Sequence, residues 1–141
     1  MLQIRNAQIA ALNDALWERC LDRLRRAAVH VYPKLDSTVN ERNDLDTVLR
    51  RICADSQAYD ISDDDDVAVF AGIAGVGLSI PPDNPPALPW MVPILERRNC
   101  SGKARLGIIC LVLRERARQD PAARRLMTHV DAIRKAFDAE K

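Results

Sequence analysis

The sequence predicts an all-α fold: a bundle of about five main helices plus one short helix. Apolar residues recur every three or four positions along most of the chain, as one face of a helix requires. The breaks between these stretches hold residues that cap or end helices, and the one β-branched run has no second strand to pair with. The 141 residues can bury one core, so we expect a single helical domain over residues 1–141.

The first two predicted helices lie before the aspartate-rich segment that begins at Asp60. One runs from Asn6 to Val31 and ends because Pro33 disfavours a helical residue before it. A polar, turn-like segment, 36–43, follows, and the second helix starts with Asn43 or Asp44 as its cap. The apolar positions that mark these two helices are Ile9, Leu12, Leu16, Cys20, Leu24, Ala27 and Val31, and then Leu45, Val48, Leu49, Ile52 and Cys53.

The third predicted helix begins after Ser62 as its cap and runs to Leu78. Four aspartates, 63–66, stand at its start, where the helix macrodipole favours anions. Glycines at 72, 75 and 77 lower the helix propensity, which either close packing against another helix or fraying would explain.

A proline-rich loop over about residues 79–93 separates this helix from the rest of the chain. Its six prolines exclude regular structure through most of its length. Near its end, Met91 to Arg97 can form a short helix with Pro93 in the first turn, and we expect Trp90 to anchor the loop to the body.

The last two predicted helices occupy residues 101–118 and the segment after Asp120. The run from Leu106 to Leu113 is apolar on all sides, which predicts a buried central helix. Asp120 is a typical N-cap and Pro121 a typical first helical residue. The stripe of the last helix consists of Leu126, Val130, Ile133 and Phe137.

No pattern of catalytic, cofactor-binding or metal-binding residues stands out, so we expect a non-enzymatic protein without a cofactor. The aspartate-rich segment from Asp60 to Asp66 resembles a calcium loop, but Asp65 stands where such a loop needs glycine and Ala71 where it needs glutamate. The four cysteines form no CxxC pair and are expected to be reduced thiols, with those at 20 and 53 on apolar helix faces. The two histidines have no partner visible in the sequence, which predicts packed or surface residues.

Charge is distributed unevenly although the net charge is only +1. Residues 1–54 carry nine basic and seven acidic side chains, residues 55–96 none and eight, and residues 97–141 twelve and five. Either the acidic and basic regions offset each other within the fold, or one of them meets a partner of opposite charge. Our candidate protein interface is Asp60, Asp63, Asp64, Asp65 and Asp66 with Trp90 in the adjacent loop.

The alternative from another functional class is a small DNA-binding or regulatory protein that uses the basic carboxy-terminal helices. Aromatic residues make up only 4% of the chain and do not interleave with the arginines, which argues against a nucleic-acid partner. The segment Met1–Ala15 lacks the apolar core of a secretory signal, and no run approaches the roughly 20 apolar residues of a membrane span, so we expect a cytoplasmic protein without a membrane partner.

Three segments together resemble a family of small, uncharacterised bacterial proteins encoded beside type VI secretion spike and effector genes. They are the opening Met1–Leu12 with the helix end near Pro33, then Tyr59–Asp63 running into Asp66–Phe70, and finally Leu88–Trp90 followed by Ile94–Leu95. The resemblance implies a helper of interbacterial competition, either an immunity protein or an effector adaptor or chaperone. Its partner would be a toxin, an effector or a spike component, and the oligomeric state stays open.

Overall fold

The fold is all-α, as the sequence predicts. The computed structural model describes residues 2–32, 39–74 and 88–140, and the side chains of 15–32, 45–74 and 88–140. These residues contain no strand and form α1 (Leu2–Val31), α2 (Val39–Ala58), α3 (Asp64–Ile73), α4 (Met91–Leu95), α5 (Gly102–Arg116) and α6 (Pro121–Ala139). The expectation of five main helices and a short one is confirmed, the short one being α4.

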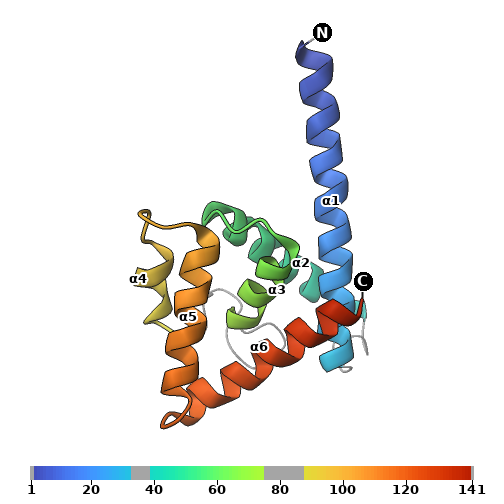
Figure 1. The fold of residues 1–141 in the computed structure, drawn as a ribbon. Coiled ribbons are helices and arrows are strands. Elements are labelled where there is room, and N and C mark those ends of the chain that lie inside the picture. Colours follow the sequence, from blue (N-terminus) through green and yellow to red (C-terminus); the bar gives the residue numbers. More distant parts are fainter. Residues whose placement is uncertain (1, 33–38, 75–87, 141) are drawn as a thin grey trace.

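Helix α3 is the centre of the packing. It contacts α2, α5 and α6, and its residues Val67 to Ile73 are all buried (Figure 1). Helix α6 runs across the base of the molecule and contacts α1, α3 and α5, while α4 packs on α5. At Gly72 a Cβ atom would lie only 3.0 Å from the Cα of Val130 on α6, so the absent side chain allows the two helices to approach. Close packing therefore explains Gly72, while residues 75 and 77 lie outside the described residues.

The prediction that α5 is the buried central helix is wrong. Leu111 on α5 is 67% exposed and Gly107 is exposed, whereas Leu106, Ile109 and Leu113 are buried. This spacing of three and four residues marks one covered face, so the contacts of α5 with α3, α4 and α6 leave the rest of its circumference exposed. The stretch that is enclosed on all sides is the uncharged half of α3.

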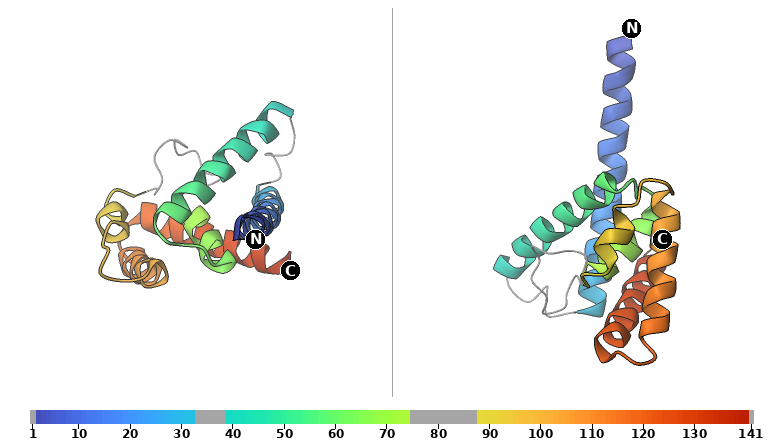
Figure 2. Two further views of the ribbon diagram at one scale, coloured as in Figure 1. Left: turned by 90° about the horizontal axis from the view of Figure 1, so that it is seen from above. Right: turned by 90° about the vertical axis from the view of Figure 1, so that its left-hand side faces the viewer.

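Helix α1 projects out of the body. Its carboxy-terminal half packs against α2 and α6, and its amino-terminal half stands clear of the other described helices (Figures 1 and 2). With 30 residues at a rise of 1.5 Å each, the helix is about 45 Å long.

Several helix ends differ from the sequence-based prediction. Helix α1 begins at Leu2, and α2 begins at Val39, so Asn43 and Asp44 lie inside α2 and do not cap it. Residues 39–43 of the predicted polar turn are helical, because polar side chains are tolerated on a helix face whatever their turn propensity, while residues 36–38 lie outside the described residues. Asp63, not Ser62, occupies the N-cap position of α3, and it makes no side-chain capping bond.

The predicted acidic first turn of α3 and the predicted start of α6 are confirmed. Three aspartates, 64–66, occupy the first turn of α3. Asp120 caps α6 by accepting a hydrogen bond from the Ala122 amide at 3.0 Å, with Pro121 as the first helical residue. The four predicted stripe positions of α6 are buried.

The described end of the proline-rich loop agrees with the prediction in outline. Residues 79–87 of that loop, and the predicted continuation of the third helix to Leu78, lie outside the described residues. Helix α4 contains Pro93 but ends at Leu95, two residues early. Trp90 packs against the core, and the Arg116 guanidinium lies 4.8 Å from its ring centre, so this residue does anchor the end of the loop. None of the helices in the described ranges is long and apolar enough to cross a bilayer.

Candidate functional site

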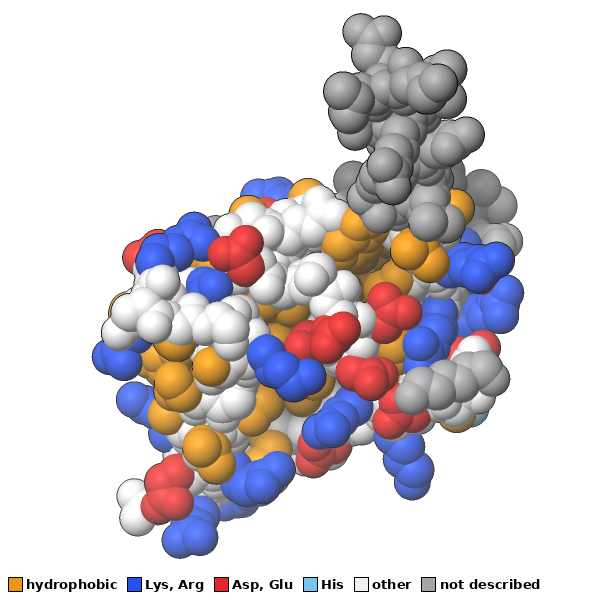
Figure 3. Space-filling model, turned by 45° about the horizontal axis from the view of Figure 1, so that its top comes forward, with side chains coloured by type: hydrophobic (Ala, Val, Ile, Leu, Met, Phe, Trp, Pro, Cys, Tyr) orange, Lys and Arg blue, Asp and Glu red, His pale blue; other side chains and the backbone are white. Residues whose placement is uncertain are grey.

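The aspartates of the predicted interface lie in the link between α2 and α3 and at the start of α3. Lys103 on α5 lies 3.4 Å from the Asp63 carboxylate and 3.8 Å from that of Asp66. Arg23 on α1 lies 3.9 Å from Asp64. Acidic and basic side chains are therefore neighbours on this face (Figure 3), as expected if the charged regions offset each other within the fold.

Asp60 belongs to a tight joint between the end of α2 and the start of α5. Its backbone has a φ of 60°, in the left-handed region, and its carboxylate lies 3.6 Å from Arg98. A Cβ atom at Gly102, the first residue of α5, would lie 2.4 Å from the Asp60 carbonyl oxygen. The two backbones touch here, so Asp60 has a structural role whatever its carboxylate binds.

A buried arginine that sequence reasoning missed holds this joint together. Arg105 on α5 is 1% exposed. Its guanidinium donates to the carbonyl oxygens of Tyr59 at 2.7 Å, of Ser101 at 3.3 Å and of Leu95. It thus connects the end of α2, the end of α4 and the start of α5. Because its main partners are backbone carbonyls distant in sequence, no pattern of side chains could have identified it.

The structure does not bring Trp90 into the same patch as the aspartates. Trp90 contacts Arg116 near the carboxyl end of α5, whereas Asp63 and Asp66 contact Lys103 near its amino end. Thirteen residues separate these two positions, which corresponds to about 20 Å along a helix. The predicted interface is therefore divided between the two ends of α5.

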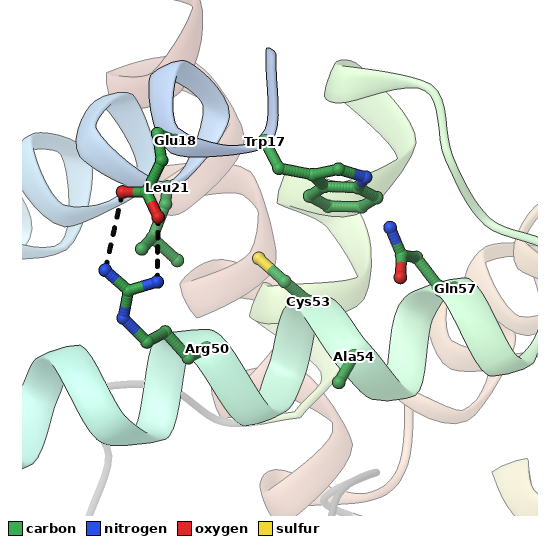
Figure 4. Close-up of a pocket in the computed structure, with 7 residues that line it drawn as sticks. All are labelled: Trp17, Glu18, Leu21, Arg50, Cys53, Ala54 and Gln57. Atoms are coloured by element: carbon green, nitrogen blue, oxygen red, sulfur yellow. Dashed lines mark hydrogen bonds and ion pairs between the residues drawn. The ribbon is translucent and has the colours of Figure 1, made fainter. Parts of the chain in front are cut away.

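A cleft between α1 and α2 is a second candidate site, and sequence reasoning did not propose it. Its volume is about 400 Å³ (Figure 4). The wall from α1 consists of Trp17, Glu18 and Leu21, and the wall from α2 of Arg50, Cys53, Ala54 and Gln57. The periodicity of apolar residues predicts each of the two helices, but it does not show that α1 and α2 pack against each other.

One end of the cleft is polar and the other is apolar. The Glu18 carboxylate accepts two hydrogen bonds from Arg50, at 2.9 and 3.4 Å, and the Arg50 charge lowers the pKa of Glu18 (Figure 4). Further along, the Trp17 ring lies over α2 between Cys53 and Gln57. The exposed ion pair bridges the two helices at this end, and the indole ring offers a large apolar surface beside it.

Leu16, which precedes Trp17 on α1, is a second apolar residue with exposed surface near the cleft end of the helix. It is 51% exposed at the point where α1 leaves the body. Cys20 and Leu24, one and two turns further on, are buried in the core. Figure 3 shows hydrophobic side chains gathered at the foot of the projecting segment. The apolar stripe of α1 is thus covered within the body and becomes uncovered as the helix projects.

The cysteines and histidines have the packed or surface positions expected from the sequence. Burial raises the pKa of Cys20 to about 12 and of Cys53 to about 11, so both thiols stay protonated at neutral pH. His30 is exposed and His129 is buried. In the described parts of the chain, no three metal-ligating side chains gather closely enough to hold a metal ion.

Several cations of the basic carboxy-terminal region already have partners within the protein. Besides Arg98, Lys103 and Arg105, Arg124 donates to the carbonyl oxygens of Ala117 at 3.1 Å and Arg118 at 3.3 Å. These bonds satisfy carbonyls at the end of α5. Residues 97–141 carry twelve basic and five acidic side chains, a net charge of +7. Part of this charge is therefore bound within the protein, which weakens the DNA-binding alternative.

Comparison of the chain with protein-family models, with curated protein sequences and with solved structures found no significant match.

Proposed function

We propose that this protein is a non-catalytic protein-binding module that uses the projecting half of α1 together with the α1–α2 cleft. The observation that carries the proposal is the half-exposed Leu16, at which the apolar stripe of α1 passes from the core onto an uncovered helix. The interface predicted from the sequence, Asp60 and Asp63–Asp66 with Trp90, stays a prediction about a separate surface.

We expect a helix of the partner protein to pack against this apolar stripe of α1. Isolated helices shorter than about 12 to 15 residues are marginal in water, and the half of α1 that stands clear of the other described helices has about that length. The sequence places Ile9 and Leu12 in register with Leu16 on one helix face. Burying the exposed half of Leu16 contributes roughly 1 to 1.5 kcal/mol, and burying each further apolar side chain of that face contributes roughly 1.5 to 3 kcal/mol, before the costs of association.

The more specific role we propose is that of an immunity protein or an effector adaptor at a type VI secretion locus. Its support is the resemblance of the three sequence segments to proteins encoded at such loci. The partner would then be a toxin, an effector or a spike component that presents an apolar helix or groove. Both roles need binding without catalysis.

The test is co-expression with the products of the neighbouring genes, followed by pull-down and measurement of affinity. Leu16→Asp should weaken binding at least tenfold, because a carboxylate would replace the apolar contact. Leu111→Asp is the matched control, since Leu111 is 67% exposed on α5, away from α1. Circular dichroism should show both variants folded.

Two outcomes would contradict the proposal. If Leu16→Asp bound as tightly as the parent, or if both variants lost affinity equally, the α1 surface would not be the interface. Recovery of duplex DNA whose binding falls steeply with salt would support the DNA-binding alternative instead.

A further inference from the structure

A pocket between the end of α1 and the first turns of α6 is lined by a buried histidine, one of whose ring nitrogens has no hydrogen-bond partner among the described residues. The pocket has a volume of about 600 Å³, within the range of sites that hold small molecules. Val31 and Tyr32 line it from the α1 side, and Pro121, Arg125, Thr128 and His129 line it from α6.

His129 forms the polar part of this pocket with Tyr32. The histidine is 3% exposed, and its Nδ1 lies 2.6 Å from the Tyr32 hydroxyl oxygen. Its other ring nitrogen, Nε2, is buried and has no hydrogen-bond partner among the described residues. An unsatisfied buried polar atom costs about 1 to 3 kcal/mol, and because Nε2 is fully buried, a ligand in the pocket bonds to it only if the lining side chains move.

The pair has one hydrogen left to donate in either tautomer. Burial lowers the pKa of His129 to about 4 and raises the pKa of Tyr32, so both groups are neutral at pH 7. If the Tyr32 hydroxyl donates to Nδ1, Nε2 carries a hydrogen without an acceptor. If Nδ1 donates to Tyr32, the hydroxyl hydrogen lacks an acceptor instead. In both cases one hydrogen of the pair lacks an acceptor, on Nε2 in the first case and on the Tyr32 hydroxyl in the second, where Nε2 is itself an acceptor without a donor.

Arg125 places a positive charge at the same pocket. Burial and then the positive charge of Arg125 lower the pKa of His129, and the same charge opposes the rise that burial causes in the pKa of Tyr32. Arg125 therefore acts on both rings. Arg124 also lines the pocket, but its guanidinium is bonded to carbonyls at the end of α5. We therefore expect Arg125 to be the side chain that pairs with a bound anion.

We propose that this pocket binds a small organic carboxylate. The carboxylate would pair with Arg125, whose planar guanidinium matches it in geometry, and accept the remaining hydrogen of the Tyr32–His129 pair. The apolar body would contact Val31 and Pro121. This site lies at the opposite end of the body part of α1 from Leu16, so it does not depend on the proposed protein interface.

Nitrogen-15 NMR of the histidine rings at pH 7 tests this assignment, with sodium benzoate as the probe. The chain has only two histidines, so the exposed His30 serves as an internal reference. Benzoate should shift the His129 ring nitrogens in a saturable way and leave those of His30 unchanged. Arg125→Gln should weaken binding at least tenfold, whereas Arg134→Gln, on an exposed position of the same helix, should bind as the parent does.

Three results would overturn the proposal: no saturable shift at His129, equal affinity of the parent and Arg125→Gln, or an equal saturable shift with inorganic phosphate at matched ionic strength. The last would show a site for anions in general, because phosphate has no apolar body. Both variants change exposed residues, so loss of folding does not obscure the comparison.

Discussion

Replacing Arg105 by methionine should destabilise the protein strongly, although the substitution keeps a long apolar side chain. The guanidinium is buried and donates to the carbonyl oxygens of Tyr59 and Leu95, on two different elements. A hydrogen bond to a charged group contributes about 1.5 to 3 kcal/mol, so the loss of these two should cost about 3 to 6 kcal/mol. Asp60, 3.9 Å away, is 76% exposed and adds little.

Thermal and urea unfolding followed by circular dichroism measure this effect. At about 3 °C per kcal/mol for a chain of this size, the melting temperature should fall by roughly 10 to 20 °C. The matched control is Arg98→Met. Arg98 also contacts Asp60 and donates to a backbone carbonyl, that of Ala58 at 3.4 Å, but it is 61% exposed, and its loss should cost about 0.5 kcal/mol or less. Equal losses in the two variants would refute the argument that burial makes Arg105 important.

Two further predictions concern proton binding and backbone contact. Lowering the pH from 7 to 4.5 should cost about 2 to 3 kcal/mol of stability through His129, because between pH 6.5 and about 4 the unfolded chain binds a proton that the folded state excludes. The difference in urea midpoint between the parent and His129→Gln across that pH range measures it. Gly107→Ala should raise stability by up to about 1 kcal/mol, since no atom lies within 4 Å of the new Cβ, whereas Gly102→Ala should lower it by about 1 to 3 kcal/mol through the clash with Asp60.

Each of these predictions has a clear contrary result. A parent and a His129→Gln variant that lose stability in parallel from pH 7 to 4.5 would show that His129 is protonated alike in the folded and unfolded states. If Gly102→Ala unfolded at the same urea concentration as Gly107→Ala, the contact between α5 and the Asp60 carbonyl would not be a constraint.

The helices could be predicted from the sequence because most of them bury one face at a period of 3.6 residues, and the buried part of α3 follows an acidic first turn that marks its start. The stripe of α6 and the capping of that helix by Asp120 are local features, and both are confirmed. The ranking of the helices by burial could not be predicted in this way. The run from Leu106 to Leu113 is more apolar than the short α3, but α3 is the helix that others surround on every side.

The polar parts of the two candidate sites depend on contacts between distant residues. Tyr32 and His129 are 97 residues apart, and Glu18 and Arg50 are 32 apart. Sequence reasoning expected a packed or surface histidine, which describes both His30 and His129, but it could not show that one of them has an unsatisfied nitrogen. Such a site is a property of tertiary packing, and neither residue carries a local motif for it.

The separation of charge along the chain is explained in part by pairing within the fold, but this pairing does not remove the acidic surface. Ion pairs between exposed side chains contribute about 0 to 1 kcal/mol, because water screens the charges and ordering the side chains costs entropy. Asp63 and Lys103 are 72% and 74% exposed, whereas the Asp66 side chain is only 19% exposed. Lys103 can therefore leave Asp63 for a small cost, while Asp66 is held more firmly against the body. If the acidic segment does meet a basic partner, the exposed carboxylates of Asp60, Asp63 and Asp64 can exchange their internal cations for those of the partner.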